Sequence, residues 1–431
     1  MSKEENRKNF SKYVSQNILG MIGFSCYVLA DSYFISIAKG ADGLTALNLV
    51  MPLYSIIFSI GEMIGVGSAI RYAISKIKKD ADADDYFWNA LIWCIMSSMI
   101  FVFAGIFFSA DIMRVLGADE HIVAVGNNYT KIFMCFAPMF MCNYVTNAFV
   151  RNDGAPGIAM SATLFSSLFN IVFDYILMFP MNLGMEGAAL ATALSPIIGM
   201  GICSIHFFSK KSSVRLVVCK PSVRKLVAGC QLGISAFVGE MSSAVITLVF
   251  NFVILKLAGN VGVVAYGVVA NIAIVTTAVF NGIAQGSQPL ISSCFGKGDK
   301  DGCTQLKRMG YTTAFVLAAV MYSILFIFAG QFVAVFNSEG SEMLRLYATE
   351  GVKLYFIGIF FAGINIVGGG AFSATEDAFK AAVVSVARGF VLILGAVFVM
   401  SALFGMTGVW LAYAVAEGIT TFIMLVMVLR V

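Results

Sequence analysis

The stretch YVLADSYFISIAKG, from Tyr27 to Gly40, decides the fold class of this chain. It overlaps a run from Ile18 to Ala38 in which Asp31 is the single charged residue. A run of about 20 apolar residues is long enough to cross the hydrocarbon layer of a bilayer as a helix. A carboxylate near the centre of such a helix costs about 2.5–3.5 kcal/mol on insertion scales and usually faces a partner or a wet cavity. The run therefore predicts a membrane helix that carries a functional acid.

The rest of the chain repeats this pattern. Of its 431 residues, 59% are hydrophobic and 12% are charged, about half the charged fraction of a soluble protein. The mean hydropathy is +0.88. We predict an all-α polytopic membrane protein whose twelve transmembrane helices form two pseudo-symmetric six-helix bundles. The predicted spans are about 14–37, 46–71, 87–108, 129–150, 156–180, 187–208, 227–256, 263–293, 310–336, 351–373, 381–404 and 407–429.

Basic residues indicate how the chain is oriented. Twelve spans put both termini on one side, and 22 of the 28 Lys and Arg residues fall in segments or adjoining helix ends on that side. The positive-inside rule therefore predicts a multi-pass protein of the cell (cytoplasmic) membrane with both termini in the cytoplasm. The net charge of +4 comes from loops, so we expect no nucleic-acid partner. The nine cysteines lie scattered without a CxxC pair, which favours packing roles over metal binding.

An internal repeat divides the chain. A shift of 219 residues places Gly40 on Gly259 and Gly67 on Gly286, and a shift of 221 places MEGAALATA (185–193) on MTGVWLAYA (406–414). Because each half has an even number of spans, the halves share one membrane orientation and should be related by an axis along the membrane normal, with a cavity between them. We predict an N-terminal lobe (1–208), a cytoplasmic linker (209–226) and a C-terminal lobe (227–431). Two such lobes suit alternating access, which indicates a transporter.

Four polar residues of the first half form the candidate cation site: Asp31, Asn170, Asp174 and Thr192. Asn170 and Asp174 are four residues apart and therefore share one face of the fifth span. Pro196 has no N–H for the carbonyl of Thr192, which frees that carbonyl as a second oxygen. Two desolvated carboxylates do not easily carry two negative charges together, so this all-oxygen set suits Na⁺ or proton exchange. The repeat aligns Asp31 with Phe250, and this asymmetry favours function over a structural role.

Other embedded polar and aromatic residues give a weaker prediction. Glu240 is either the cation-recognising acid of the second half or a residue near the cytoplasmic mouth. Glu62 and Glu417 are interpreted as gate or packing contacts. The predicted substrate pathway consists of Tyr27, Phe34, Glu240, Asn251, Gln285 and Gln288.

Four stretches in this order resemble one family. They are ADSYFIS…KGADGLTALNLVMPL (30–53), AFVRNDGAP (148–156), MEGAALATALSP (185–196) and QGSQPLISSCFGKGD (285–299). The chain resembles, over nearly its whole length, the MATE (multidrug and toxic compound extrusion) family. The resemblance implies export of amphipathic, often cationic compounds in exchange for Na⁺ or H⁺.

The resemblance also implies which branch of the family applies. In the branch with its cation site in the N-terminal half, the coupling residues match Asp31, Asn170, Asp174 and Thr192. The other prokaryotic branch uses acids in spans seven and ten, but span ten here offers only Asn365. Some relatives bend span one at a proline; this span has none, and Gly20 and Gly23 are its flexible points.

The resulting prediction is a cation-coupled drug antiporter that acts as a monomer, is not an enzyme, and needs no cofactor beyond the coupling ion. Its partners are small amphipathic substrates, the cation and membrane lipid. One alternative is a lipid-linked oligosaccharide flippase, which needs a cationic cavity that these spans lack away from their ends. Another is an intramembrane aspartyl protease, but neither Asp31 nor Asp174 follows the Gly-x-Gly pattern typical of such enzymes.

Overall fold

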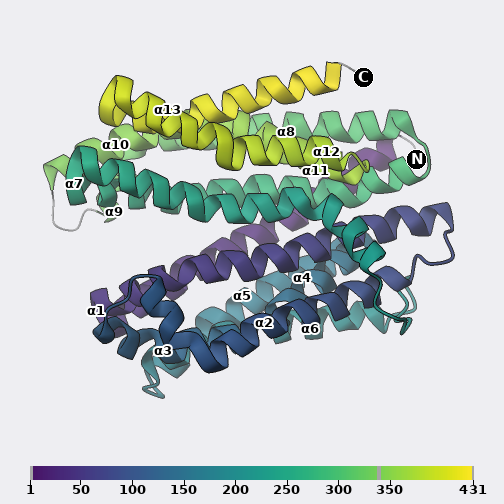
Figure 1. Ribbon diagram of the computed structural model, residues 1–431. Helices are drawn as coiled ribbons and strands as arrows, with labels where there is room; N and C mark the ends of the chain where they lie inside the picture. Colours follow the sequence, from purple (N-terminus) through teal and green to yellow (C-terminus); the bar gives the residue numbers. More distant parts are fainter. Residues whose placement is uncertain (1–2, 337–340, 430–431) are drawn as a thin grey trace.

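The computed structural model describes residues 3–336 and 341–429, and within these ranges the chain is helical with no strand. Figure 1 shows the helices stacked as two bundles, α1–α6 in one and α7–α13 in the other, with the N- and C-termini at the same end of the molecule. The helices are α1 Lys3–Lys78, α2 Asp85–Val115, α3 Glu120–Cys135, α4 Ala137–Asn152, α5 Pro156–Met178, α6 Gly184–Phe207, α7 Val223–Gly296, α8 Lys300–Ile327, α9 Ala329–Phe336, α10 Glu342–Tyr355, α11 Ile359–Ala374, α12 Ala378–Val386 and α13 Leu392–Leu429.

Three of these helices are broken, and each break separates two spans. Non-helical glycines interrupt α1 at Gly40, α7 at Gly259 and α13 at Gly405. The helices α3 and α4 meet at 46° and together form one bent span. The stretch from α10 to α11 (Glu342–Ala374) is one further span, and α12 together with the part of α13 before Gly405 is another, whereas the eight-residue α9 is too short to span. Counted this way, the described residues make twelve passes, so the predicted fold class is confirmed. The first helix begins at Lys3 rather than near residue 14, because the polar N-terminal segment continues the first span as a helix. The proposed lobe boundaries stay a prediction.

The backbone carries the internal repeat that the sequence indicated. Gly40 and Gly259 have φ of 58° and 63°, and Gly184 and Gly405, which align at a shift of 221, have 52° and 58°. These left-handed conformations are costly for residues with a Cβ, which explains glycine at these positions. The two halves therefore reverse direction with the same local geometry at equivalent points.

The two bundles meet along a seam between α1 and α7, whose mutual interface is the most extensive of any helix pair. Gly67 of α1 lies against Gly229, and a Cβ on Gly67 would come 2.0 Å from the Gly229 carbonyl oxygen. Its repeat partner Gly286 of α7 lies against Val14, where a Cβ would come 2.8 Å from Cα. Equivalent glycines thus bring the two backbones together at the end of the molecule that holds the termini.

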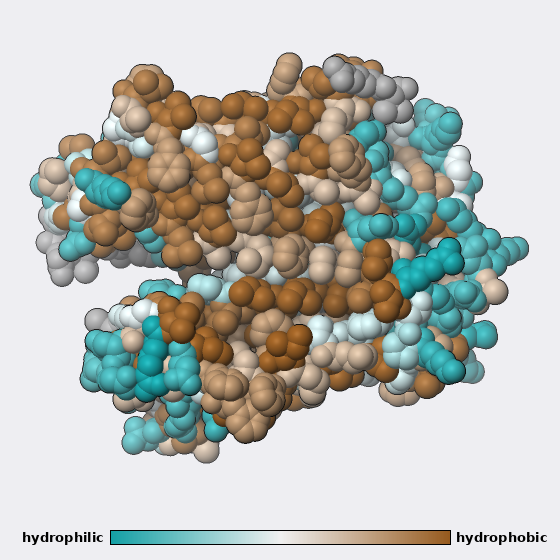
Figure 2. All heavy atoms as spheres, viewed as in Figure 1, coloured by the Kyte–Doolittle hydropathy of each residue, from teal (hydrophilic) through white to brown (hydrophobic). Residues whose placement is uncertain are grey.

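The opposite end of the seam is open. Figure 2 shows the surface hollowed between the two bundles at the end away from the termini, with a broad hydrophobic band across the middle of the molecule. Hydrophilic residues gather at both ends of that band, as expected for a protein that crosses a bilayer. The two bundles are therefore in contact at the end that holds the termini, and a cleft separates them at the opposite end.

Candidate functional site

The structure brings the four predicted cation-site residues close to one another inside the first bundle. We call Asp31 of α1, Asn170 and Asp174 of α5, and Thr192 of α6 the N-lobe pocket. Asp31 is 6% exposed and Asp174 is fully buried, and the other two are buried as well. The two carboxylates are close enough for the charge of Asp31 to act on Asp174.

The amide of Asn170 holds the pocket together. With its nitrogen facing Asp174, Asn170 donates to Oδ2 of that carboxylate at 3.0 Å. Its oxygen then accepts from the backbone N–H of Thr192 at 3.2 Å and from the hydroxyl at 3.1 Å. The opposite orientation would face a carboxylate with an oxygen, so this one is preferred. Asn170 and Asp174 do share one helix face, as their spacing predicts.

Two carboxylate oxygens of the pocket have no partner. Within the described residues, the Oδ1 atoms of Asp31 and of Asp174 are both buried and accept no hydrogen bond. Buried polar atoms are nearly always satisfied, and an unsatisfied carboxylate oxygen is especially costly. These two oxygens are therefore available to bind a proton or a small cation.

The freed carbonyl of Thr192 is not available in the way that the sequence suggests. Ser195, one turn further along α6, donates its hydroxyl to this carbonyl at 3.0 Å. Ser166 of α5 in turn donates to the carbonyl of Ser195 at 2.7 Å. Pro196 does leave the Thr192 carbonyl without its helical N–H, but Ser195 replaces that donor. The hydroxyl of Thr192 remains the oxygen that faces Asn170.

Tyrosines that sequence reasoning missed lie beside the pocket. Tyr54 of α1 and Tyr129 of α3 are hydrogen-bonded through their hydroxyls, and both lie within electrostatic reach of Asp31. The ring of Tyr54 stacks on Phe133, with ring centroids 3.6 Å apart. Tyr27, which the sequence analysis predicted as a substrate-pathway residue, lies one turn before Asp31 and is also within electrostatic reach of that carboxylate. No local spacing in the sequence links Tyr54 and Tyr129 to Asp31, so only the tertiary fold shows that these two tyrosines lie beside the pocket.

The predicted substrate-pathway residues are dispersed. Phe34 packs against Tyr175 of α5 and against Phe179, the residue directly after α5, with ring centroids 6.3 and 6.1 Å apart. Glu240 of α7 is half-buried and lies within electrostatic reach of Glu62 in the other bundle, which places it beside the seam. Asn251, further along α7, is half-buried.

Gln285 and Gln288 lie on the second half of α7, and Gln285 belongs to a network that ties the bundles together. The buried Arg151 of α4 donates to Gln285 of α7 and, at 3.1 Å, to Asn17 of α1. Gln285 donates to Glu62 of α1 at 3.2 Å. We call Asn17, Glu62, Arg151 and Gln285 the inter-lobe network. Gln288 is buried nearby, next to Gly370.

The second bundle has a different polar centre. Arg388, one of the 22 basic residues that the sequence analysis assigned to the termini side, lies half-buried in a π-helical turn (Ala387–Val391) between α12 and α13, with its side chain 14% exposed. It pairs with the buried Glu417 at 2.6 Å. Asn365 donates to Glu417 at 2.7 Å and accepts from Thr421 at 3.0 Å. In contrast to the N-lobe pocket, this centre contains a balanced ion pair.

Comparisons with known proteins agree with this architecture. Residues 17–176 and 236–399 match the MatE family. The multidrug export protein MepA of Staphylococcus aureus is 28% identical over 414 residues, which cover 93% of this chain and 89% of MepA.

Solved structures share the fold. An outward-facing multidrug resistance MATE transporter of the MOP superfamily superposes with a TM-score of 0.89 at 20% identity, over 99% of this chain and 96% of that one. A MOP superfamily transporter from Pyrococcus furiosus is described as having a binding pocket of reverse polarity. It superposes with a TM-score of 0.90 at 19% identity, over 98% of this chain and 95% of that one.

Proposed function

This chain belongs to the MatE family of multidrug efflux transporters, and from that premise we propose that it exchanges Na⁺ or H⁺ for amphipathic, often cationic drugs. The coupling ion binds in the N-lobe pocket. The observation that carries this proposal is the pair of buried, unpartnered carboxylate oxygens of Asp31 and Asp174. Na⁺ and H⁺ are both consistent with an oxygen-only set, so the coupling ion stays open between them.

The pocket works because the two carboxylates share one desolvated space. Repulsion between two negative charges is strong where water does not screen them. A proton or a sodium ion relieves that repulsion, and Asn170 transmits the change because it contacts Asp174 of α5 and Thr192 of α6 at once. Cation binding therefore favours a different packing of α1, α5 and α6 from that of the empty pocket.

The direction of exchange follows from the orientation predicted by the basic residues. With both termini in the cytoplasm, the cleft in Figure 2 opens to the outside, and the cation arrives through it. Substrate and cation prefer different arrangements of the first bundle, so each lowers the affinity of the protein for the other by the same factor. An inward cation gradient then drives the drug outward.

The closed end of the seam is the cytoplasmic gate in this scheme. It is held by the glycine contacts of Gly67 and Gly286 and by the inter-lobe network. Opening toward the cytoplasm must break the contact between Arg151 and Gln285. Because these residues lie in different bundles, rocking of the bundles separates them directly.

A bulky residue in this gate should block the outward-open state. We expect Gly67→Val to reduce drug efflux from proteoliposomes at least tenfold, because the side chain would meet the Gly229 backbone and hold the bundles apart. Gly239→Val on α7 is the matched control, since no atom lies within 4 Å of a Cβ there. Efflux within twofold of wild type for Gly67→Val would contradict a close approach of α1 and α7.

Transport driven by separate gradients tests the proposed exchange. Purified protein in proteoliposomes loaded with a fluorescent amphipathic cation is given either an inward Na⁺ gradient at equal pH or a pH gradient without Na⁺. We expect at least one gradient to accelerate dye release, and dissipating that gradient with an ionophore to remove the effect. Release that responds to neither gradient would refute coupling.

The flippase alternative gains no support from the half-buried Arg388 or from the buried Arg151. Arg388 is paired with Glu417, and Arg151 is engaged by Gln285 and Asn17. The charge of Arg388 is balanced by Glu417, and that of Arg151 faces Glu62, so neither charge stands alone for the pyrophosphate of a lipid-linked sugar. The cationic cavity that such a substrate needs is therefore not provided by these two side chains.

A further inference from the structure

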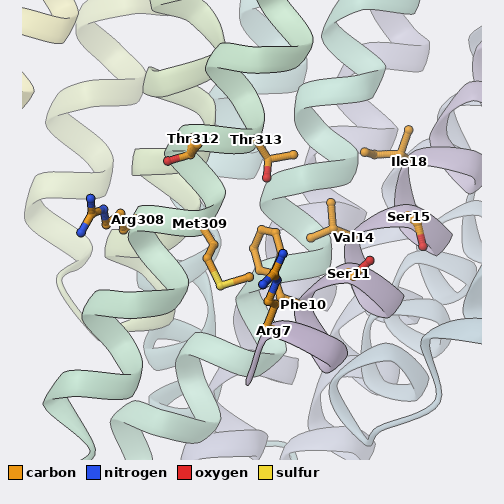
Figure 3. A pocket seen from close by; sticks show the side chains of 10 residues that line it. All are labelled: Arg7, Phe10, Ser11, Val14, Ser15, Ile18, Arg308, Met309, Thr312 and Thr313. Atoms are coloured by element: carbon orange, nitrogen blue, oxygen red, sulfur yellow. The ribbon is translucent and has the colours of Figure 1, made fainter. Parts of the chain in front are cut away.

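A groove of about 480 Å³ lies where α1 and α8 approach each other near the termini end of the molecule (Figure 3). The first bundle contributes Arg7, Phe10 and Val14 from α1, and the second contributes Arg308 and Met309 from α8. Neither the N-lobe pocket nor the inter-lobe network shares a residue with it. The transport cycle proposed above leaves this groove without a role.

The charge in the groove is uncompensated. Arg7 and Arg308 are both exposed, and within the described residues neither forms an ion pair or a hydrogen bond. Figure 3 shows Met309 between them. The groove also contains the hydroxyls of Ser11 and Thr312. Guanidinium groups and hydroxyls are the donors that bind phosphate oxygens, so the groove is suited to a phosphate-bearing ligand.

The side chains that line the groove change from polar to apolar along α1. Arg7 and Ile18, which line its two ends, are eleven residues apart, or about 16 Å along a helix. Ile18 begins the run that enters the hydrocarbon layer and whose single charged residue is Asp31, whereas Arg7 lies in the basic segment before it. Phe10 and Val14, each 4% exposed, form an apolar wall between them. A ligand with a phosphate at one end and an acyl chain at the other matches this gradient.

We propose that this groove binds an anionic phospholipid of the leaflet that faces the termini. Arg7 and Arg308, on either side of Met309, attract the anionic headgroup, and an acyl chain runs along Val14 toward Ile18. Basic pockets between transmembrane helices on the cytoplasmic side are suited to such headgroups. Free inorganic phosphate would meet the same arginines but would gain nothing from the apolar wall.

Native mass spectrometry of the purified full-length protein tests this site. The protein is titrated with phosphatidylglycerol, with phosphatidylcholine of the same acyl chains, and with phosphatidylglycerol in excess inorganic phosphate. We expect phosphatidylglycerol to bind about tenfold more tightly than phosphatidylcholine and to persist in phosphate. The variant R7Q/R308Q should lose this preference and still fold, because both side chains are exposed and unpaired.

The control variant R215Q/R224Q removes the same charge from exposed positions in the linker and at the start of α7. It should retain the wild-type preference. Equal lipid preference in R7Q/R308Q and wild type would overturn the proposal, as would an equal loss in the control, which would indicate general surface attraction. Displacement of the lipid by the excess inorganic phosphate would also overturn it, because the apolar wall would then contribute nothing.

Discussion

Asp31→Asn is expected to abolish gradient-driven drug export while the protein still folds and inserts. The substitution keeps the size of the side chain but removes the charge that attracts the cation. Without cation binding, the cation no longer lowers the affinity of the protein for the drug. Coupling of this kind typically changes an affinity by about 5- to 150-fold. Drug resistance of cells that produce the variant, together with dye efflux from proteoliposomes, measures the loss.

The control for this prediction is Asp42→Asn. Asp42 lies just beyond the break at Gly40, is largely exposed, and contacts His121 at 2.9 Å. The same chemical change there should leave efflux near the wild-type level. Asp174→Asn, by contrast, should behave like Asp31→Asn. Wild-type resistance conferred by Asp31→Asn would show that the pocket is not the coupling site.

Arg388→Met is expected to cause the largest loss of stability of any single substitution proposed for this chain. It leaves Glu417 with a buried charge whose ionic partner is gone. Removing one partner of a buried ion pair typically costs about 3–5 kcal/mol. Thermal unfolding of the purified protein in one detergent, followed by loss of the monodisperse peak, measures the effect.

The double variant R388M/E417Q provides the matched comparison. Glutamine removes the stranded charge but keeps an oxygen that can accept from Asn365, as Glu417 does at 2.7 Å. We expect most of the lost stability to return, since a buried pair contributes little net stability compared with neutral groups of similar size. A double variant as unstable as Arg388→Met would show that the charge of Glu417 is not the cause.

The sequence was sufficient for the fold because the bilayer imposes simple rules on it. Apolar runs of the right length predicted the spans, and the equivalence of Gly40 with Gly259 predicted the repeat that their φ angles now show. Part of the site followed from helical periodicity, which put Asn170 and Asp174 on one face. Thr192 of α6 contacts Asn170, and this required the packing of two separate helices.

Other features could not be predicted from spacing. Arg388 lies near the end of a predicted span, so its side chain could have extended to the membrane–water interface, as long basic side chains commonly do. The side chain of Arg388 points inward because it forms an ion pair with Glu417, which also accepts a hydrogen bond from Asn365. Arg388 itself lies in the π-helical turn. Gln285 was interpreted as a pathway residue, yet it contacts Arg151 and Glu62 from the other bundle. Such contacts depend on how the bundles pack against each other.

The most direct measurement of the central claim is the linkage between cation and drug in equilibrium binding. The Kd of a fluorescent amphipathic cation is determined for the wild-type protein and for Asp31→Asn across Na⁺ concentrations at fixed pH, and across pH without Na⁺. We predict that raising one of these cations weakens dye binding to the wild type about 5- to 150-fold, and that Asp31→Asn removes this dependence. Dye affinity of the wild type that stays constant across both titrations would contradict the claim.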